Sequence, residues 1–414
     1  MNRITMTHWV PELLSPAGSL EKLKVAVSYG ADAVYLGGQN FGLRSAADNF
    51  TETELKEGVE FAHEHGAQVY VVLNSFLYDK ELDDLPDFLK ILEEVKVDAV
   101  IVSDLGVVET VAKKSALEIH LSTQASCLNS AAAQFWKNKG VTRIVLGREV
   151  TIEEAKKIKE EVDIELEMFI HGSMCMAYSG NCVISNYTQG RDSNRGGCAH
   201  SCRFEYSISN DNSVEDSQKK FAHFMSSKDL MGLRVLQDFI DAGIDSLKVE
   251  GRMKSHHYAG TISKVYSEAL QYYKENGNLL SEDLYRWEVE LEKVSHRDYH
   301  LGNLMAPAGK ESIFPERQHA VVETKVAAMV LESIEDKYIL AEARGPFQAG
   351  DTLEYIFFKG KTHSFQLKEI QDATGETFSK ARPGMLVRLP YVREAEALNI
   401  VRALPSSLGQ REAR

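Results

Sequence analysis

"ELLSPAGSLEKLKVAVSYGADAVYLGG", residues 12–38, has the pattern of a strand, a helix and a second strand. A short apolar run lies at each end, and the segment between them repeats apolar residues at helical spacing. Gly30 separates this helical segment from the second run, as expected for a left-handed C-cap that leads into a strand. The unit therefore predicts two parallel strands joined by a helix.

The same alternation continues along the first three quarters of the chain. Strands are predicted at 12–18, 31–38, 67–75, 97–104, 117–124, 141–149, 164–172 and, after an interruption, 244–252. Gly66, Gly140 and Gly243 also end helical segments just before a strand. Eight such units over about 270 residues predict an α/β fold, a (β/α)8 TIM-like barrel, with an open doubly wound sheet as the alternative.

The later part of the chain has a different pattern. Residues 255–277 are predicted to form the helix that closes the barrel, and 284–300 a further helix or linker. From about residue 315, short alternating strands are separated by turns such as "FFKGK" and "DATGE". We therefore predict three parts: a catalytic barrel domain over 1–315 with a Cys-rich insertion at about 172–222, a small all-β barrel domain over 316–404, and a tail over 405–414.

Composition excludes several protein classes. Among the 414 residues, 43% are hydrophobic and 26% are charged, which is ordinary for a soluble globular protein. No apolar run reaches the roughly 18 residues that span a bilayer, and the first residues lack a secretory pattern, so we expect a cytoplasmic protein without membrane association. The formal net charge of -14 argues against nucleic-acid binding over the whole surface.

Local basic patches are still compatible with this charge. Candidate cations are Arg191, Arg195 and Arg203 among the cysteines, and Lys359, Lys361, Lys380, Arg382, Arg388 and Arg393 near the C-terminus.

Polar residues finish most of the predicted strands. They are Ser15, Asn74, Ser103, Asp104, Ser122, Gln124, Arg148, Glu149, His171, Glu250 and Arg252, and Arg44 lies in the loop after the second strand. Barrel enzymes build their active sites at this end of the strands. A single Ser or Asn there can also be polar simply because the strand leaves the core.

The arginines and amides of this set predict a substrate pocket. Arg44, Arg148 and Arg252 converging on one end of the barrel would bind an anion, because guanidinium groups match carboxylate or phosphate oxygens bidentately. Asn74 and Gln124 are further candidates for substrate binding.

Glu149, His171 and Glu250 are the candidate catalytic residues. Each has a structural alternative, because a carboxylate can hold a neighbouring arginine and a strand-end histidine can be a hydrogen-bonded core residue. The sequence contains neither a G-x-S-x-G nor an H-E-x-x-H motif, so the usual signatures of serine and zinc hydrolases are absent.

Four of the five cysteines lie between residues 171 and 203. Cys175 and Cys182 are separated by six residues, Cys182 and Cys198 by fifteen, and Cys198 and Cys202 by three. Four thiolates are the ligand set of a 4Fe-4S cluster or of a structural zinc. The six-residue gap favours the cluster, because zinc-binding pairs usually have shorter gaps. Cys127 stands alone and is expected to be a buried apolar residue.

The Cys-rich segment directly follows the seventh strand, so its metal group would lie at the catalytic end of the barrel. This position favours a redox or substrate-orienting role, and a cluster that only stabilises a long insertion is the alternative.

Several of these stretches resemble one known family. Residues 12–38, "EMFIHGSMCMAYSGNCVISNY" at 167–187, "GGCAHSCR" at 196–203 and "KVEGRMKS" at 248–255 are similar to the collagenase-like U-32 peptidase family. The similarity covers essentially the whole chain, and its branch is that of the bacterial prephenate-dependent tRNA uridine(34) hydroxylases.

The resemblance implies conversion of wobble uridine in tRNA to 5-hydroxyuridine, with prephenate as co-substrate and a 4Fe-4S cluster on Cys175, Cys182, Cys198 and Cys202. The implied partners are tRNA, prephenate or a similar small dicarboxylate, and a paralogous protein. Related proteins hydroxylate ribosomal RNA or quinone precursors, so the family alone leaves the substrate open. Two alternatives are a collagenase-like peptidase and a non-catalytic, metal-stabilised module that binds RNA or a partner.

Overall fold

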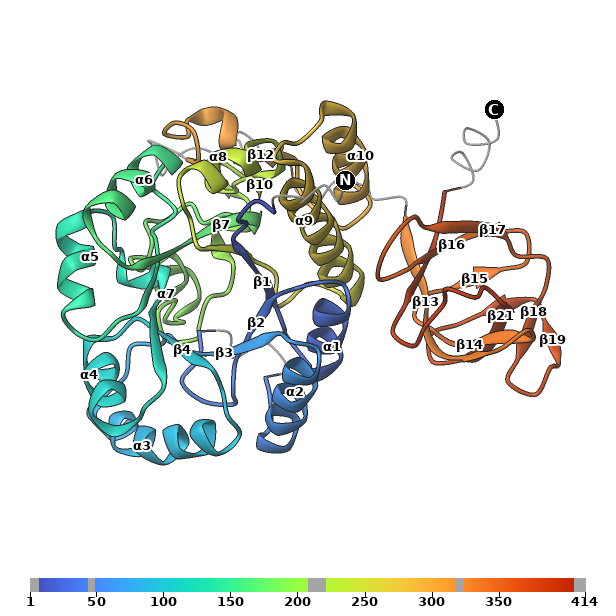
Figure 1. Ribbon diagram of the computed structural model, residues 1–414, viewed down its shortest axis with the longest axis horizontal. Helices are drawn as coiled ribbons and strands as arrows, with labels where there is room; N and C mark the ends of the chain where they lie inside the picture. The colour runs from blue at the N-terminus through green and yellow to red at the C-terminus, as the bar shows by residue number, and fades with distance from the viewer. Residues whose placement is uncertain (1–6, 44–48, 208–220, 317–323, 406–414) are drawn as a thin grey trace, which may run out of the picture.

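Eight parallel strands form a closed barrel in the N-terminal part of the chain (Figure 1). The computed structural model describes residues 7–43, 49–207, 221–316 and 324–405. The barrel strands are β1 (Glu12–Pro16), β2 (Ala33–Leu36), β3 (Gln68–Leu73), β4 (Ala99–Val102), β5 (Glu118–Leu121), β6 (Arg143–Val145), β7 (Glu165–Ser173) and β11 (Ser246–Val249). Strand β11 pairs in parallel with both β1 and β7, which closes the ring and confirms the predicted barrel over the open sheet.

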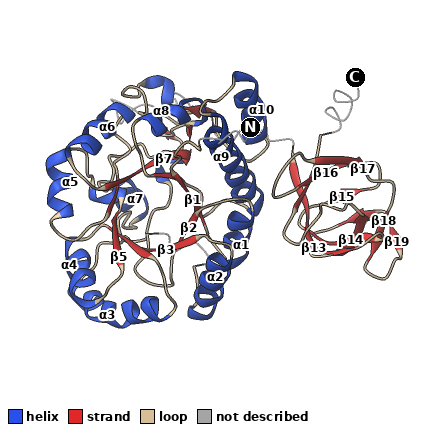
Figure 2. Ribbon diagram, in the orientation of Figure 1, coloured by secondary structure: helices blue, strands red, loops and turns tan. Residues whose placement is uncertain are grey.

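Helices cover the outside of the barrel (Figure 2). They are α1 (Leu20–Ser28), α2 (Glu52–Glu64), α3 (Asp79–Glu94), α4 (Leu105–Lys114), α5 (Ser130–Lys137), α6 (Ile152–Glu161), α8 (Leu236–Asp241) and α9 (His256–Asn276). Gly30, Gly66, Gly140 and Gly243 all have positive φ, as predicted for helix ends that lead into a strand. Within the described residues, no helix has both the length and the apolar character needed to cross a membrane.

The Cys-rich insertion leaves the barrel after β7. It contains α7 (Ile184–Gln189) and a pair of short strands, β8 (Tyr206–Ser207) and β9 (Phe221–Ala222). Its last strand, β10 (Asp229–Met231), runs antiparallel to the end of β7, and β12 (Tyr299–His300) pairs with β10 in turn. These two added strands attach both the insertion and the segment after α10 (Ser281–Leu291) to the barrel.

The C-terminal part of the chain is the predicted all-β domain. Its eight-stranded antiparallel sheet has the order β17-β16-β22-β13-β14-β21-β18-β19. The bounds are β13 (Lys325–Ile334), β14 (Tyr338–Ala343), β16 (Thr352–Ile356), β17 (His363–Gln366), β18 (Ile370–Asp372), β19 (Thr377–Phe378), β21 (Leu386–Pro390) and β22 (Ile400–Ala403), with β15 (Phe347–Gln348) and β20 (Lys380–Ala381) as a separate pair. Among the described residues no ladder joins β17 to β19, so the sheet is a half-barrel.

A small buried interface joins the two domains. Val25 and Tyr29 of α1 pack against Met329, Ile356 and Ile400 of the half-barrel. The Tyr29 hydroxyl donates to the Ile356 carbonyl and accepts a hydrogen bond of 2.9 Å from the Ile400 amide. One side chain therefore satisfies a buried donor and a buried acceptor of the other domain.

We predict that Tyr29→Phe destabilises the protein without changing its shape. The substitution removes only the hydroxyl and leaves the Ile356 carbonyl and the Ile400 amide buried and unpaired, which costs roughly 1–3 kcal/mol. Urea unfolding measures the effect, and Tyr285→Phe on α10, whose side chain is exposed, is the control. A stability equal to that of the control would show that this hydroxyl does not hold the domains together.

Candidate active site

An open cavity of about 570 Å³ lies at the mouth of the barrel, the end at which the strands finish. Its lining residues are Tyr35, Leu43, Val72, Asn74, Ile101, Ser122, Thr123, Gln124, Val145, Arg148, Phe169, Cys175, Lys248, Glu250 and Arg252. All the described residues predicted to bind substrate are in this set, together with one predicted metal ligand. Arg44 lies outside the described residues.

Arg148 is a cation of the cavity that stacks on an aromatic ring. Its guanidinium lies over the Phe169 ring, 3.8 Å from the ring centre, and its Nε is buried without a hydrogen-bond partner. Within the described residues, its side chain makes no hydrogen bond or ion pair with the protein. The residue is half-buried in an open cavity, so this guanidinium is placed to receive an anionic ligand.

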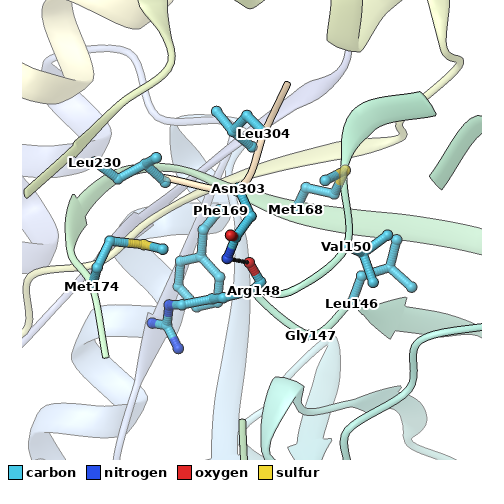
Figure 3. A pocket seen from close by; sticks show the side chains of 10 residues that line it. All are labelled: Leu146, Gly147, Arg148, Val150, Met168, Phe169, Met174, Leu230, Asn303 and Leu304. Carbon is cyan, nitrogen blue, oxygen red and sulfur yellow. Dashed lines mark hydrogen bonds between the residues drawn. The ribbon is translucent and has the colours of Figure 1, made fainter. Parts of the chain in front are cut away.

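A second, apolar pocket of about 290 Å³ adjoins the cavity and shares the Arg148–Phe169 pair with it (Figure 3). Its other lining residues are Leu146, Gly147, Val150, Met168, Met174, Leu230, Asn303 and Leu304. The Asn303 amide donates to the Arg148 carbonyl at 2.8 Å, which fixes the backbone from which the guanidinium extends.

Lys248 is a cation of the cavity that the sequence analysis missed. Its Nζ lies 2.6 Å from Oε1 of Glu167 and 4.4 Å from the centre of the Tyr35 ring. Burial opposes ionisation of Glu167, but the positive charges of Lys248 and Arg143 outweigh it and hold the pKa of that carboxyl below its usual value. A lysine inside the apolar run "DSLKVEG" was the available signal, because buried lysines are rare unless paired.

Arg252 occupies space that two glycines leave open. The residue is buried, and a Cβ on Gly37 would lie 2.4 Å from its Nη1 atom. A Cβ on Gly18 would lie 2.0 Å from its carbonyl oxygen. The glycines of "SPAG" and "LGG" are therefore needed for the close approach of Arg252 to the cavity.

Glu250 and the amides add neutral and acidic groups to the cavity. Oε2 of Glu250 accepts a hydrogen bond of 3.2 Å from the Tyr35 hydroxyl. Oδ1 of Asn74 accepts from the Leu43 amide at 3.1 Å, which directs the Asn74 NH2 group to other acceptors. Glu250 is thus a carboxylate within reach of a bound ligand, as its candidate role requires.

Glu149 has a different position from the one expected of a catalytic residue. It does not line the cavity, and its Oε1 accepts a hydrogen bond of 2.9 Å from the Ser179 amide in the Cys-rich insertion. The Ser179 hydroxyl in turn accepts from the Arg148 amide at 3.2 Å. Glu149 therefore holds the insertion next to Arg148. This is a structural role rather than a catalytic one.

His171 is also not brought to the cavity. The pairing of β11 with β7 shifts register after Phe169, and this irregularity turns His171 away from the face on which Glu167 and Phe169 lie. His171 is buried beside Tyr266 and Tyr299, with Nδ1 3.2 Å from the Tyr266 hydroxyl. Burial lowers the pKa of His171 to about 3, so the ring is neutral at ordinary pH.

Other strand-end residues have local roles. Asp104 caps α4 by accepting from the Gly106 amide at 2.6 Å, and Ser122 accepts from the Gln124 amide at 3.3 Å. The hydroxyl of Ser15 is hydrogen-bonded to that of Ser263 on α9.

The four cysteines of the insertion lie near one another, and Cys175 reaches the cavity. Burial raises the pKa of Cys202, and the neighbouring thiols of Cys175, Cys198 and Cys182 raise it further, against the opposing charge of Arg203. Cys127, in contrast, is fully buried in the barrel core, as expected.

Arg203 holds the two ends of the Cys-rich segment together. Its Nη2 donates to the Met174 carbonyl at 2.6 Å and its Nη1 to the Ser227 carbonyl at 2.9 Å. Met174 precedes Cys175 and Arg203 follows Cys202, so one guanidinium fixes the neighbours of the first and last cysteines. This cation is therefore occupied by the protein and is not part of a free basic surface.

Four cysteines can hold either a single zinc ion or a 4Fe-4S cluster. One tetrahedral zinc would draw its sulfur ligands to about 3.8 Å from each other, given the usual zinc–sulfur bond length. In the described part of the chain, no three His, Cys, Asp or Glu side chains are grouped closely enough to hold a single metal ion.

Comparison with known proteins gives a consistent result over the whole chain. The model of "Peptidase family U32" matches residues 18–313, and that of "Peptidase family U32 C-terminal domain" matches residues 323–402. The chain is 43% identical to tRNA hydroxylation protein P1 of Bacillus subtilis over 95% of this chain and 94% of that protein. It is 32% identical to tRNA hydroxylation protein P of Haemophilus influenzae over 91% of this chain and 92% of that protein.

Among solved structures, the U32 peptidase Mk0906 matches with a TM-score of 0.39 and 16% identity. The match covers 61% of this chain and 97% of that one.

His171 gives a prediction about stability and pH. The unfolded chain binds a proton at this residue as the pH falls below about 6.5, whereas the native protein does so only near pH 3, so stability is present at neutral pH and is lost as the pH falls through this window. At pH 5 the loss is about 2 kcal/mol. Urea unfolding at pH 7 and pH 5 should show a smaller difference for His171→Gln than for the wild type.

The exposed His363 provides the matched control, because His363→Gln should leave the pH difference unchanged. An unchanged difference in His171→Gln would mean that folding does not lower the pKa of His171.

Proposed function

Since the chain belongs to peptidase family U32, with tRNA hydroxylation proteins among its full-length relatives, we propose that it is a tRNA-hydroxylating enzyme. We further propose that it converts wobble uridine to 5-hydroxyuridine, with prephenate as co-substrate and a 4Fe-4S cluster on Cys175, Cys182, Cys198 and Cys202. One observation carries this proposal: Cys175 lies in the same cavity as the cations Arg148, Lys248 and Arg252.

The cations of the cavity support the proposal of a small dicarboxylate as ligand. Arg148 has an unpaired guanidinium, and Lys248 is held by Glu167 at the cavity wall. Two carboxylates of prephenate would take these positions through charge-assisted hydrogen bonds, which are about twice as strong as neutral ones. Arg252, held in the space left by Gly37, supplies a third cation for the same ligand.

The neutral groups suit a pyrimidine base. The Asn74 NH2 group and the Gln124 side chain can donate to the carbonyl oxygens of uracil. Glu250, next to the Tyr35 hydroxyl, is the carboxylate that can accept a proton from the substrates or return one. When bound, a 4Fe-4S cluster would supply one-electron chemistry, and Cys175, one of its proposed ligands, lines the cavity.

Peptide hydrolysis finds less support in this cavity. The residues that line it include Ser122, Thr123 and Cys175 as possible nucleophiles but no histidine that could serve as their base. His171 is buried on the other face of β7. A peptidase would therefore have to use Glu250 or Lys248 as its base, without a histidine in the described lining.

The function is tested in a strain that lacks the gene and every paralogue of it. We expect tRNA from this strain to lose 5-hydroxyuridine derivatives, and the wild-type chain to restore them. Arg148→Gln should lower the modified fraction on the order of tenfold, because it removes a charged hydrogen-bonding partner of the ligand. Arg286→Gln, at an exposed arginine of α10, is the control. Nucleoside analysis that finds no change on deletion contradicts the function, and cleavage of gelatin by the pure protein would favour the peptidase.

The cofactor is tested by anaerobic purification followed by iron, sulfide and zinc assays. We expect a brown protein with about four iron and four sulfide per chain, the composition of a 4Fe-4S cluster. Cys175→Ser should lose most of the iron, whereas Cys127→Ala, at the lone buried cysteine, should retain it. A colourless protein that carries zinc contradicts the cluster.

A further inference from the structure

We propose that Tyr78, at the mouth of the barrel, is a platform on which an unpaired base of the substrate RNA stacks. This inference rests on the proposed function and adds to it the place where the RNA is held outside the cavity. Tyr78 immediately precedes α3, and 68% of its surface is exposed. Most of its ring surface is therefore open to contact by a ligand.

Arg195 of the Cys-rich insertion covers one face of the Tyr78 ring. The guanidinium lies 4.0 Å from the ring centre. Glu81 holds that guanidinium with two hydrogen bonds of 3.0 and 2.9 Å, and it also accepts from the Tyr78 amide at 2.8 Å. The Phe76 carbonyl accepts from Arg195 as well. The ring, the guanidinium and the carboxylate hold one another in place as one unit. Binding of a ligand would therefore cost little further conformational entropy.

This unit lies where the barrel mouth meets the Cys-rich insertion. The Phe76 amide donates to the Asn194 carbonyl at 3.2 Å, and the Asn194 side chain donates to the Cys182 carbonyl at 3.1 Å. On the other side, Asn74, four residues before Tyr78, lines the cavity. Tyr78 therefore lies on the part of the rim between the cavity and the Cys-rich insertion, where an RNA loop that delivers a base beside Cys175 can contact it.

An unpaired base is the occupant that suits an exposed tyrosine backed by a guanidinium. One face of the ring is covered by Arg195 and the ring as a whole is open, so a second planar group can stack on it. Arg191, exposed in the same loop as Arg195, can meet a backbone phosphate. The insertion presents two more open aromatic rings, Tyr178 and Tyr187, with 52% and 86% of their surfaces exposed.

A structural role would make different demands on this position. If Tyr78 only shielded the Arg195–Glu81 pair from water, an aliphatic side chain of similar size would serve as well. Stacking on a base needs an aromatic ring but not its hydroxyl. Tyr78→Leu and Tyr78→Phe therefore separate the two roles.

The experiment measures equilibrium binding of the full-length, cluster-loaded protein to unmodified tRNA by fluorescence anisotropy, with a fully paired RNA duplex as the comparison ligand. We expect Tyr78→Leu and Tyr78→Ala to weaken tRNA binding about tenfold, and Tyr78→Phe to bind like the wild type. Binding to the duplex, which has no unpaired base, should not change. Tyr285→Ala is the matched control: its side chain is 67% exposed, and Figure 1 places α10 on the opposite side of the barrel from α3.

Each outcome of the binding experiment either supports or overturns the role of Tyr78 as a stacking platform. Wild-type affinity in both Tyr78→Leu and Tyr78→Ala overturns the platform while the proposed function stands, provided that the wild type binds and modifies tRNA. An equal loss for duplex and tRNA, or a loss in Tyr78→Phe as large as in Tyr78→Leu, also overturns it. Unchanged tRNA binding with loss of a co-purifying protein assigns the surface to a protein partner instead. A wild type that neither binds nor modifies tRNA contradicts the proposed function itself.

Discussion

The ion pair between Glu167 and Lys248 connects the strands that close the barrel and lies at the wall of its cavity. Glu167 is fully buried on β7, and Lys248 lies on β11, so the pair crosses the two strands that close the ring. A buried carboxylate is costly unless it is paired, and removing one partner of such a pair typically costs 3–5 kcal/mol. The same contact holds the Lys248 ammonium at the cavity wall. Closure of the barrel and the charge of the site are thus coupled through one hydrogen bond.

The barrel could be predicted because its signal is periodic. Every strand predicted from an apolar run is a strand of the ring, and four glycines mark helix ends with positive φ. Parallel strands covered on both faces are apolar throughout, and for that reason their sequences do not reveal which residues face inward. Lys248 was therefore missed, and His171 was placed in the site. The direction of His171 depends on a register shift between β7 and β11, which no single strand sequence contains.

Two residues that are adjacent in the sequence, Arg148 and Glu149, have different surroundings, and the sequence could not show this. Arg148 and Glu149 follow the same strand, but the arginine lies over Phe169 at the cavity while the glutamate bonds to Ser179 in the insertion. The different positions of Arg148 and Glu149 depend on the Cys-rich insertion. The conformation of the insertion is itself fixed by contacts between residues far apart in the sequence. Arg203, close to Cys202, reaches back to the Met174 carbonyl. The cysteine spacing predicted a shared metal group, but it could not predict which strand ends the insertion would contact.

The acidity of the chain limits how it can hold RNA. Affinity for RNA usually comes from cations that neutralise phosphates, and the net charge here is -14. Around the Cys-rich insertion, Arg195 is paired with Glu81 and Arg203 is bound to backbone carbonyls, so two of the three arginines predicted to form a basic patch are used by the protein. Open aromatic surface is present instead, on Tyr78 at the rim and on Tyr178 and Tyr187 of the insertion. A surface of this kind discriminates through unpaired bases, because a paired helix hides the faces on which the rings would stack. Under the proposed function, these rings would favour a loop over a stem before any base enters the cavity.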